Sequence, residues 1–128
     1  MQAALRARPV AVVGASANRA KYGNLVLRHL RARGWPVYAV NPGAAQIEGQ
    51  PAYASLGACP ERPGLAVLVV PPDATLRILA EAARLGVPHL WLQPGAESDE
   101  VLEQARRLGL RVIHDACIMV MAGQQADG

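Results

Sequence analysis

The residues best suited to bind a charged ligand lie in one short segment, Pro9–Gly23, with the sequence PVAVVGASANRAKYG. An apolar run, Val10–Val13, stops at Gly14; small and polar residues follow, and then Arg19 and Lys21. This pattern is typical of a buried strand, a tight loop and a helix. A helix N-terminus carries partial positive charge and unpaired N–H groups, so the loop suits an anion. Because the chain's only lysine also lies here, we expect a phosphate-bearing ligand.

A second group of reactive side chains, His114, Asp115 and Cys117, lies near the C-terminus. A Cys–His pair supports nucleophilic chemistry when the side chains meet and the thiol pKa falls. Neighbours in a strand point to opposite faces, and Cys117 can equally be a small buried hydrophobe. We therefore expect no catalytic residue. No pair of histidines or carboxylates has metal-ligand spacing, so we also expect no metal.

The elements that position these residues follow from an alternation of short apolar runs with helical patterns. Their order predicts an α/β fold, a three-layer Rossmann-like, doubly wound parallel sheet of about five strands with right-handed crossovers. The segment 44–63 is expected to be irregular, with a short helix at 53–56. The expected strands are Val10–Val13, Val37–Val40, Leu65–Val70, His89–Leu92 and Arg111–His114, and the expected helices are Tyr22–Arg33, Asp73–Leu85, Ser98–Leu108 and Ala116–Met121.

The loops that follow the predicted strands are rich in glycine and proline. In open parallel sheets, ligands bind beyond the carboxyl ends of the strands, and glycine lets the backbone approach a ligand closely. Any one such loop is equally explained as an ordinary turn, but convergence on one rim favours a ligand crevice. The loops are Gly14-Ala15-Ser16, Asn41-Pro42-Gly43, Pro71-Pro72 and Gln93-Pro94-Gly95.

A dinucleotide site does not fit this loop well. The GxGxxG pattern needs two more glycines, but Ser16 and Arg19 stand at those positions. The second predicted strand ends in Val40-Asn41, without the carboxylate that binds a ribose hydroxyl. The phosphate-loop pattern GxxxxGK[ST] is absent too. NAD is therefore disfavoured, although the fold class is suitable.

Composition narrows the other possibilities. The length of 128 residues predicts one domain, 1–128. A net charge of +3 without an aromatic-interleaved basic stripe argues against nucleic acid. No apolar run approaches the ~20 residues of a membrane span, and MQAALRARP lacks the apolar stretch of a signal peptide. Two cysteines outside any CxxC motif indicate a reduced, cytoplasmic protein.

Several motifs in order resemble the CoA-binding domain family, which is similar to the N-terminal domain of the succinyl-CoA ligase α subunit and often stands alone. The resemblance covers about residues 10–121. The chain has no counterpart of that ligase's phosphohistidine domain, so we expect CoA binding without ligase chemistry. The motifs are VAVVGAS, VNP at Val40–Pro42, G-x-x-x-Y-x-S-L at Gly49–Leu56, WLQPGA at Trp91–Ala96 and Cys117-Ile118-Met119.

The resemblance implies a Rossmann-like domain that binds coenzyme A or an acyl-CoA in the crevice. CoA carries a pyrophosphate and a ribose phosphate, which suit helix amides and the two loop cations. The implied phosphate-binding residues are Gly14, Ala15, Ser16, Asn18, Arg19, Lys21 and Gly23. The remaining implied site residues are Asn41 and Pro42 at the nucleotide, Val70, Pro71 and Pro72 along the nucleotide or pantetheine, and Gln93, Pro94 and Gly95 at the adjoining strand end.

Other functions stay open at this point. One is a small acyl-CoA processing enzyme that uses Cys117 or His114, and a mixed disulfide between Cys117 and the CoA thiol is a related possibility. Another is a nicotinamide nucleotide-binding regulatory protein. A third is a structural subunit with a vestigial crevice. The apolar composition makes a homodimer or a protein partner plausible.

Overall fold

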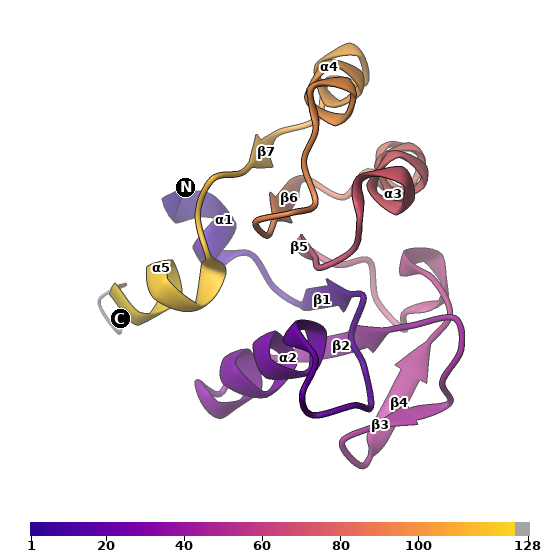
Figure 1. The fold of residues 1–128 in the computed structure, drawn as a ribbon, viewed down its shortest axis with the longest axis vertical. Helices are drawn as coiled ribbons and strands as arrows, with labels where there is room; N and C mark the ends of the chain where they lie inside the picture. The colour runs from indigo at the N-terminus through magenta and orange to yellow at the C-terminus, as the bar shows by residue number, and fades with distance from the viewer. Residues whose placement is uncertain (125–128) are drawn as a thin grey trace.

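A seven-stranded sheet forms the centre of the molecule, with the strand order β3-β4-β2-β1-β5-β6-β7 (Figure 1). The structure is a computed structural model that describes residues 1–124. The strands are β1 (Val10–Val13), β2 (Val37–Val40), β3 (Gln46–Ile47), β4 (Gln50–Tyr53), β5 (Leu65–Leu68), β6 (His89–Leu92) and β7 (Val112–Ile113). The helices are α1 (Gln2–Arg6), α2 (Tyr22–Ala32), α3 (Pro72–Leu85), α4 (Asp99–Arg107) and α5 (Ile118–Gln124), with a 3₁₀ turn η1 (Leu56–Ala58).

The parallel part of the sheet reverses its order beside β1. Only the β3–β4 pair is antiparallel among the described pairings. Without β3, the strands follow the order 3-2-1-4-5-6 of doubly wound nucleotide-binding folds. The α/β Rossmann-like class expected from the sequence is therefore confirmed. The reversal places a topological switch point between β1 and β5, where such folds bind ligands.

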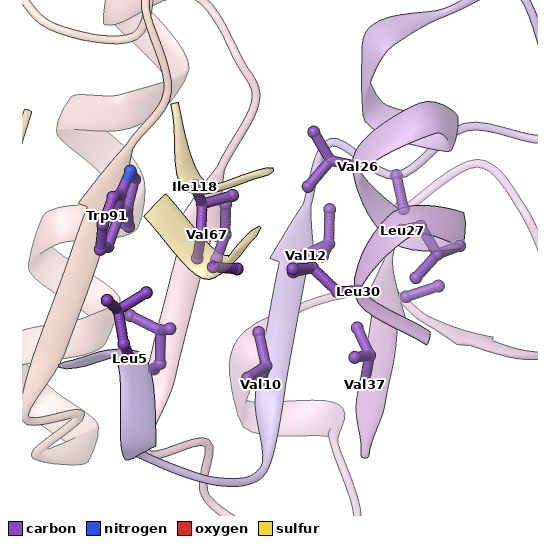
Figure 2. Close-up of a cluster of buried hydrophobic side chains, with 14 of the residues drawn as sticks. Leu5, Val10, Val12, Val26, Leu27, Leu30, Val37, Val67, Trp91 and Ile118 are labelled. Carbon is purple, nitrogen blue, oxygen red and sulfur yellow. The ribbon is translucent and has the colours of Figure 1, made fainter. Parts of the chain in front are cut away.

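The two faces of the sheet are covered by different helices, and Figure 1 shows α1, α2 and α5 on one side and α3 and α4 on the other. Side chains alternate between faces along a strand. Val10 and Val12 therefore belong to the cluster under α2, while Ala11 and Val13 belong to the cluster under α3 and α4. Figure 2 shows the first of these clusters, where Val12 packs toward α2. All four β1 residues are buried, as expected for a parallel sheet covered on both faces.

The segment 44–63 differs most from expectation. It forms the β3–β4 hairpin, and β4 adds to the sheet in parallel with β2, pairing Ala39 with Ala52 and Val40 with Tyr53. In place of the expected helix at 53–56, β4 ends at Tyr53 and the 3₁₀ turn η1 begins at Leu56. The strand was not predicted because QPAY contains Pro51, has no apolar alternation and is at most half-buried.

Smaller differences concern element ends. β5 stops at Leu68, so Val69 and Val70 belong to the loop that follows it. β7 is only Val112–Ile113. α3 begins at Pro72, one residue before the expected start at Asp73, and Pro71 occupies its N-cap position. Within residues 1–124, no helix has the length and apolar character needed to cross a membrane.

Candidate functional site

Two cavities open at the carboxyl ends of the parallel strands. The first, of about 470 Å³, lies between the start of α2 and the loops after β5 and β6. The second, of about 400 Å³, lies between the ends of β1, β2 and β4 and the first turns of α3. Val70 lines both, so the cavities adjoin at the β1–β5 switch point. The first is lined by Tyr22, Val69, Val70, Pro71, Gln93, Pro94, Gly95 and Ala96. The second is lined by Val13, Gly14, Val40, Asn41, Pro42, Ala54, Ser55, Leu56, Val70, Ala74, Arg77, Ile78 and Glu81.

Two glycines bring α2 against the end of β1. Gly14 has a φ of +94°, and a Cβ there would stand 2.2 Å from the carbonyl oxygen of Val69. A Cβ on Gly23 would stand 2.0 Å from the carbonyl oxygen of Gly14. Neither position therefore accepts a larger residue without movement of the backbone. Gly23 lies outside the GxGxxG spacing, yet it provides the close helix packing that the last glycine of that pattern provides.

The N-termini of α2 and α3 both lie at this rim. Neither helix has a side chain that caps its first turn, and the first turn of α2 contains no acidic residue. Tyr22, the first residue of α2, lines the first cavity, and Ala74, in the first turn of α3, lines the second. Uncapped N–H groups and the helix dipole make such helix ends suitable for anions.

The polar side chains of the β1–α2 loop hold the loop itself. Ser16 Oγ accepts the N–H of Asn18 at 3.1 Å, and Asn18 Oδ1 accepts an N–H two residues on at 2.9 Å. Asn24 Nδ2 donates to the carbonyl of Ser16 at 2.7 Å. Asn41 Nδ2 donates to the carbonyl of Ala15 at 2.8 Å, which ties the loop to the end of β2. These bonds fix the path of the backbone that borders the second cavity.

The two loop cations have different surroundings. Arg19 Nη2 lies 3.5 Å from Glu48 Oε1 on the β3–β4 turn. The other oxygen of Glu48 accepts Asn24 Nδ2 at 3.2 Å. Lys21 occupies the N-cap position of α2 and is exposed, and no described residue pairs with its ammonium group. Neither cation lines the first or the second cavity.

Two charged side chains on α3 lie at the site without having been predicted there. Arg77 and Glu81 both line the second cavity. The Glu81 carboxylate accepts the N–H of Leu56 at 3.2 Å and that of Gly57 at 3.3 Å, so it holds η1 as a wall of that cavity. Nothing in the sequence distinguishes these two side chains from ordinary exposed charges, because their placement depends on the strand β4 that was also missed.

A cysteine, a tyrosine and a glutamine meet beside the first cavity. The hydroxyl of Tyr22 lies 3.1 Å from Cys117 Sγ. Gln93 is buried; its Nε2 donates to Tyr22 and Cys117, each at 3.5 Å, and its Oε1 accepts the N–H of Ile118 at 2.8 Å. Burial raises the pKa of the Cys117 thiol, but hydrogen bonds from Tyr22, Gln93 and backbone N–H groups outweigh it and lower that pKa below its usual value.

The histidine that could activate this thiol points elsewhere. His114 Nδ1 lies 2.7 Å from Asp115 Oδ2, and the side chains that hydrogen-bond to Cys117 Sγ within residues 1–124 are those of Tyr22 and Gln93. In the same part of the chain, no group of three His, Cys, Asp or Glu could hold a metal ion. Trp91 is buried, and its Nε1 donates to the carbonyl of Ala116 at 2.9 Å, so it packs and does not face the crevice.

The predicted site residues thus fall into two groups. Most of the residues expected after β2, β5 and β6 line a cavity, as does Gly14, which follows β1. Those expected at the β1–α2 loop mostly shape or flank the rim. The cavity-lining group is Gly14, Asn41, Pro42, Val70, Pro71, Gln93, Pro94 and Gly95. The residues that line neither cavity are Ala15, Ser16, Asn18, Arg19, Lys21, Gly23 and Pro72.

Comparison with known proteins agrees with this architecture. The ADP-forming acetate–CoA ligase I of Archaeoglobus fulgidus is 32% identical over 119 residues, which cover 85% of this chain and 17% of that protein. The α subunit of the ADP-forming acetate–CoA ligase II of Pyrococcus furiosus is 30% identical over 125 residues, which cover 89% of this chain and 27% of the subunit. The chain thus spans about a quarter or less of the length of these relatives.

The chain is also similar to a solved structure and matches a protein family over most of its length. A conserved hypothetical protein from Pyrococcus furiosus has a TM-score of 0.85 and 42% identity, covering 89% of this chain and 98% of that one. The family described as the CoA binding domain matches residues 8–123. This match runs from before β1 to within one residue of the end of α5, so it covers the whole sheet and the helices that pack on it, apart from α1. The chain therefore belongs to the CoA binding domain family.

Proposed function

We propose that residues 1–128 act as a single domain that binds coenzyme A or an acyl-CoA in the crevice formed by the two cavities. The observation that carries this proposal is the pair of adjoining cavities at the β1–β5 switch point, beside two uncapped helix N-termini. Family membership supplies the ligand class. An extended ligand with a nucleotide at one end and a pantetheine arm at the other suits two adjoining cavities better than one.

The two cavities differ in chemistry. The second combines apolar walls such as Ile78 and Leu56 with Asn41, Ser55 and Arg77, and suits a nucleotide. The first is mostly apolar, with Tyr22 and Gln93 as its polar side chains, and suits a pantetheine arm. In this arrangement the loop 14–23 and the start of α2 hold the pyrophosphate between them.

Isothermal titration tests the proposal directly. Purified protein is titrated with CoA, with acetyl-CoA and with NADH. We expect CoA or acetyl-CoA to bind at micromolar strength and NADH to give no heat of binding. Binding of NADH alone would favour the nicotinamide nucleotide regulator. No response to any of the three would contradict ligand binding and favour a structural subunit.

Acyl-CoA processing is the second candidate, favoured by the lowered pKa of Cys117 beside the first cavity. We propose binding without catalysis, since the described residues place no base against the thiol. Replacing Cys117 by Ser separates these functions: in an enzyme, thioester turnover is lost while CoA binding remains. Turnover of acetyl-CoA by the wild-type protein that Cys117→Ser abolishes would establish the enzyme.

Location and assembly are further parts of the proposal. We propose that the protein acts in the cytoplasm, either as a homodimer or with a protein partner. One relative is named as an α subunit, which supports association with a second chain. Light scattering of the purified protein, alone and with CoA, measures its assembly state. A monomer in both conditions would contradict the homodimer.

A further inference from the structure

Among residues 1–124, one cationic side chain lines the second cavity, and it does not come from the β1–α2 loop. Arg77, on the second turn of α3, is the only Lys or Arg among the residues that line the two cavities of the rim. The predicted loop cations, Arg19 and Lys21, lie outside both. A ligand in the second cavity therefore meets Arg77 as its nearest source of positive charge on a side chain.

The guanidinium of Arg77 is available to a ligand because neither of the described carboxylates four positions away on α3 holds it in an ion pair. Asp73 precedes Arg77 and Glu81 follows it, each at a spacing at which opposite charges can pair across one helical turn. Both oxygens of Glu81 instead accept backbone N–H groups of η1, at 3.2 and 3.3 Å. The hydrogen bond recorded for Arg77 is a long one, 3.4 Å, from Nη1 to the backbone carbonyl of Asp73. No described carboxylate pairs with it.

The walls around Arg77 indicate what it would bind. Val40, Leu56 and Ile78 offer apolar surface for a flat ring, and Arg77 lies on the α3 side of the same cavity. A guanidinium presents a rigid set of N–H donors that matches a phosphate dianion. The nucleotide half of CoA has the matching chemistry, a purine with a phosphomonoester on the adjoining ribose.

We propose that Arg77 binds the ribose 3′-phosphate of CoA and is the residue by which the crevice distinguishes CoA from nucleotides that lack this phosphate. This inference rests on the proposed function, because it assumes that CoA occupies the crevice. It differs from the sequence-based expectation, in which Arg19 and Lys21 supply the phosphate-binding cations. In the structure Arg19 forms an ion pair with Glu48.

The test compares CoA with 3′-dephospho-CoA for the wild-type protein and two variants. Arg77→Gln removes the guanidinium, and Arg84→Gln is the matched control, an exposed arginine in the last turn of the same helix that lines neither cavity. We expect the wild-type protein and Arg84→Gln to bind CoA about tenfold or more tightly than 3′-dephospho-CoA. This is the effect of losing one charge-assisted hydrogen bond that water partly screens. Arg77→Gln should lose this preference and bind 3′-dephospho-CoA as the wild-type protein does.

Each other result has a distinct meaning. If Arg77→Gln weakens both ligands equally, Arg77 acts on the base or the pyrophosphate and the inference is wrong. If Arg77→Gln keeps the preference for CoA, another group binds the 3′-phosphate and the inference is equally wrong, while CoA binding stands. If the wild-type protein binds neither ligand, the proposed function fails together with the inference. Circular dichroism melts of both variants confirm that they fold, so a lost preference is not mistaken for unfolding.

Discussion

The hydroxyl of Tyr22 lies 3.1 Å from the Sγ of Cys117, although 95 positions separate the two residues in the chain. They meet because α2 and α5 pack side by side on one face of the sheet. Gln93, at the end of β6, is within 3.5 Å of both. Tyr22 and Gln93, which line the first cavity, thus contact Cys117 on a third segment that only the completed sheet brings beside them.

Replacing Tyr22 by Phe should slow alkylation of Cys117. Hydrogen bonding to Cys117 and burial raise the pKa of Tyr22 to about 12, so its hydroxyl remains a donor at pH 7–9. Losing that donor raises the pKa of Cys117 and lowers its thiolate fraction near neutral pH. We expect a roughly 3- to 10-fold slower reaction with iodoacetamide at pH 7.5. Mass spectrometry of the modified protein across pH 6–10 gives the pH–rate profile.

Cys59 and Tyr38 supply the controls. Burial, with a contribution from Glu81, raises the pKa of Cys59 to about 11, so this second thiol should react much more slowly than Cys117 at pH 8. Tyr38→Phe removes a hydroxyl that donates to Glu61 and should leave the reaction of Cys117 unchanged. An unaltered profile in Tyr22→Phe would show that Tyr22 does not stabilise the thiolate.

Replacing Gly23 by Ala should destabilise the fold. The added methyl group would stand 2.0 Å from the carbonyl oxygen of Gly14, so α2 must move away from β1. We expect a loss of about 1–3 kcal/mol in the free energy of unfolding, the usual range for overpacking. Gly123→Ala is the helical control, because a Cβ there meets nothing within 4 Å; it should be neutral or stabilise by up to about 1 kcal/mol. Urea unfolding measures both, and equal stabilities would contradict the close packing.

The sequence predicted the strands and helices whose apolar periodicity is strong. Val10–Val13, Val37–Val40 and His89–Leu92 have the predicted bounds, because buried parallel strands are short uninterrupted apolar runs. β4 was missed because a short, partly exposed strand with a proline at its second position has no such pattern. Its position is determined by pairing with β2, which is a tertiary contact.

The same distinction applies to the site. Turn chemistry predicts the rim, and Gly14, Asn41 and Pro94, which it picks out, do line a cavity. Arg77 and Ser55 have no such signal, because their approach to the second cavity depends on where β4 and η1 lie. The contribution of Arg19 and Lys21 to ligand binding stays a prediction, and the sequence does not show that Arg19 lies beside Glu48, because that contact also depends on the β3–β4 hairpin.

Replacing Lys21 by Ala should weaken CoA binding more than replacing Arg19 does. Arg19 already has a carboxylate partner, whereas no described residue pairs with Lys21. For exposed charges near an anionic ligand, we expect about two- to fivefold weaker binding for Lys21→Ala at low salt, decreasing as salt is added. Titration at two salt concentrations tests this, with Arg84→Ala as the control. A larger effect of Arg19→Ala would show that ligand binding releases Arg19 from Glu48.

Two substitutions of Gln93 should separate its structural contribution from its electrostatic one. Gln93→Leu leaves the N–H of Ile118 without its acceptor, since Oε1 is the atom that accepts it at 2.8 Å. A buried, unsatisfied N–H costs about 1–3 kcal/mol, and urea unfolding should show a loss of that size. Gln93→Glu keeps the acceptor but replaces the Nε2 donor with negative charge beside Cys117.

The carboxylate of Gln93→Glu should raise the pKa of Cys117, because a neighbouring negative charge disfavours the thiolate. We therefore expect slower alkylation of Cys117 at pH 7.5 in Gln93→Glu, together with a smaller loss of stability than in Gln93→Leu. If the two variants lose the same stability, the hydrogen bond from Ile118 to Gln93 does not account for that loss. If Gln93→Glu leaves the alkylation profile unchanged, the Nε2 donor contributes nothing to the acidity of the thiol, and Tyr22 and the backbone N–H groups account for all of it.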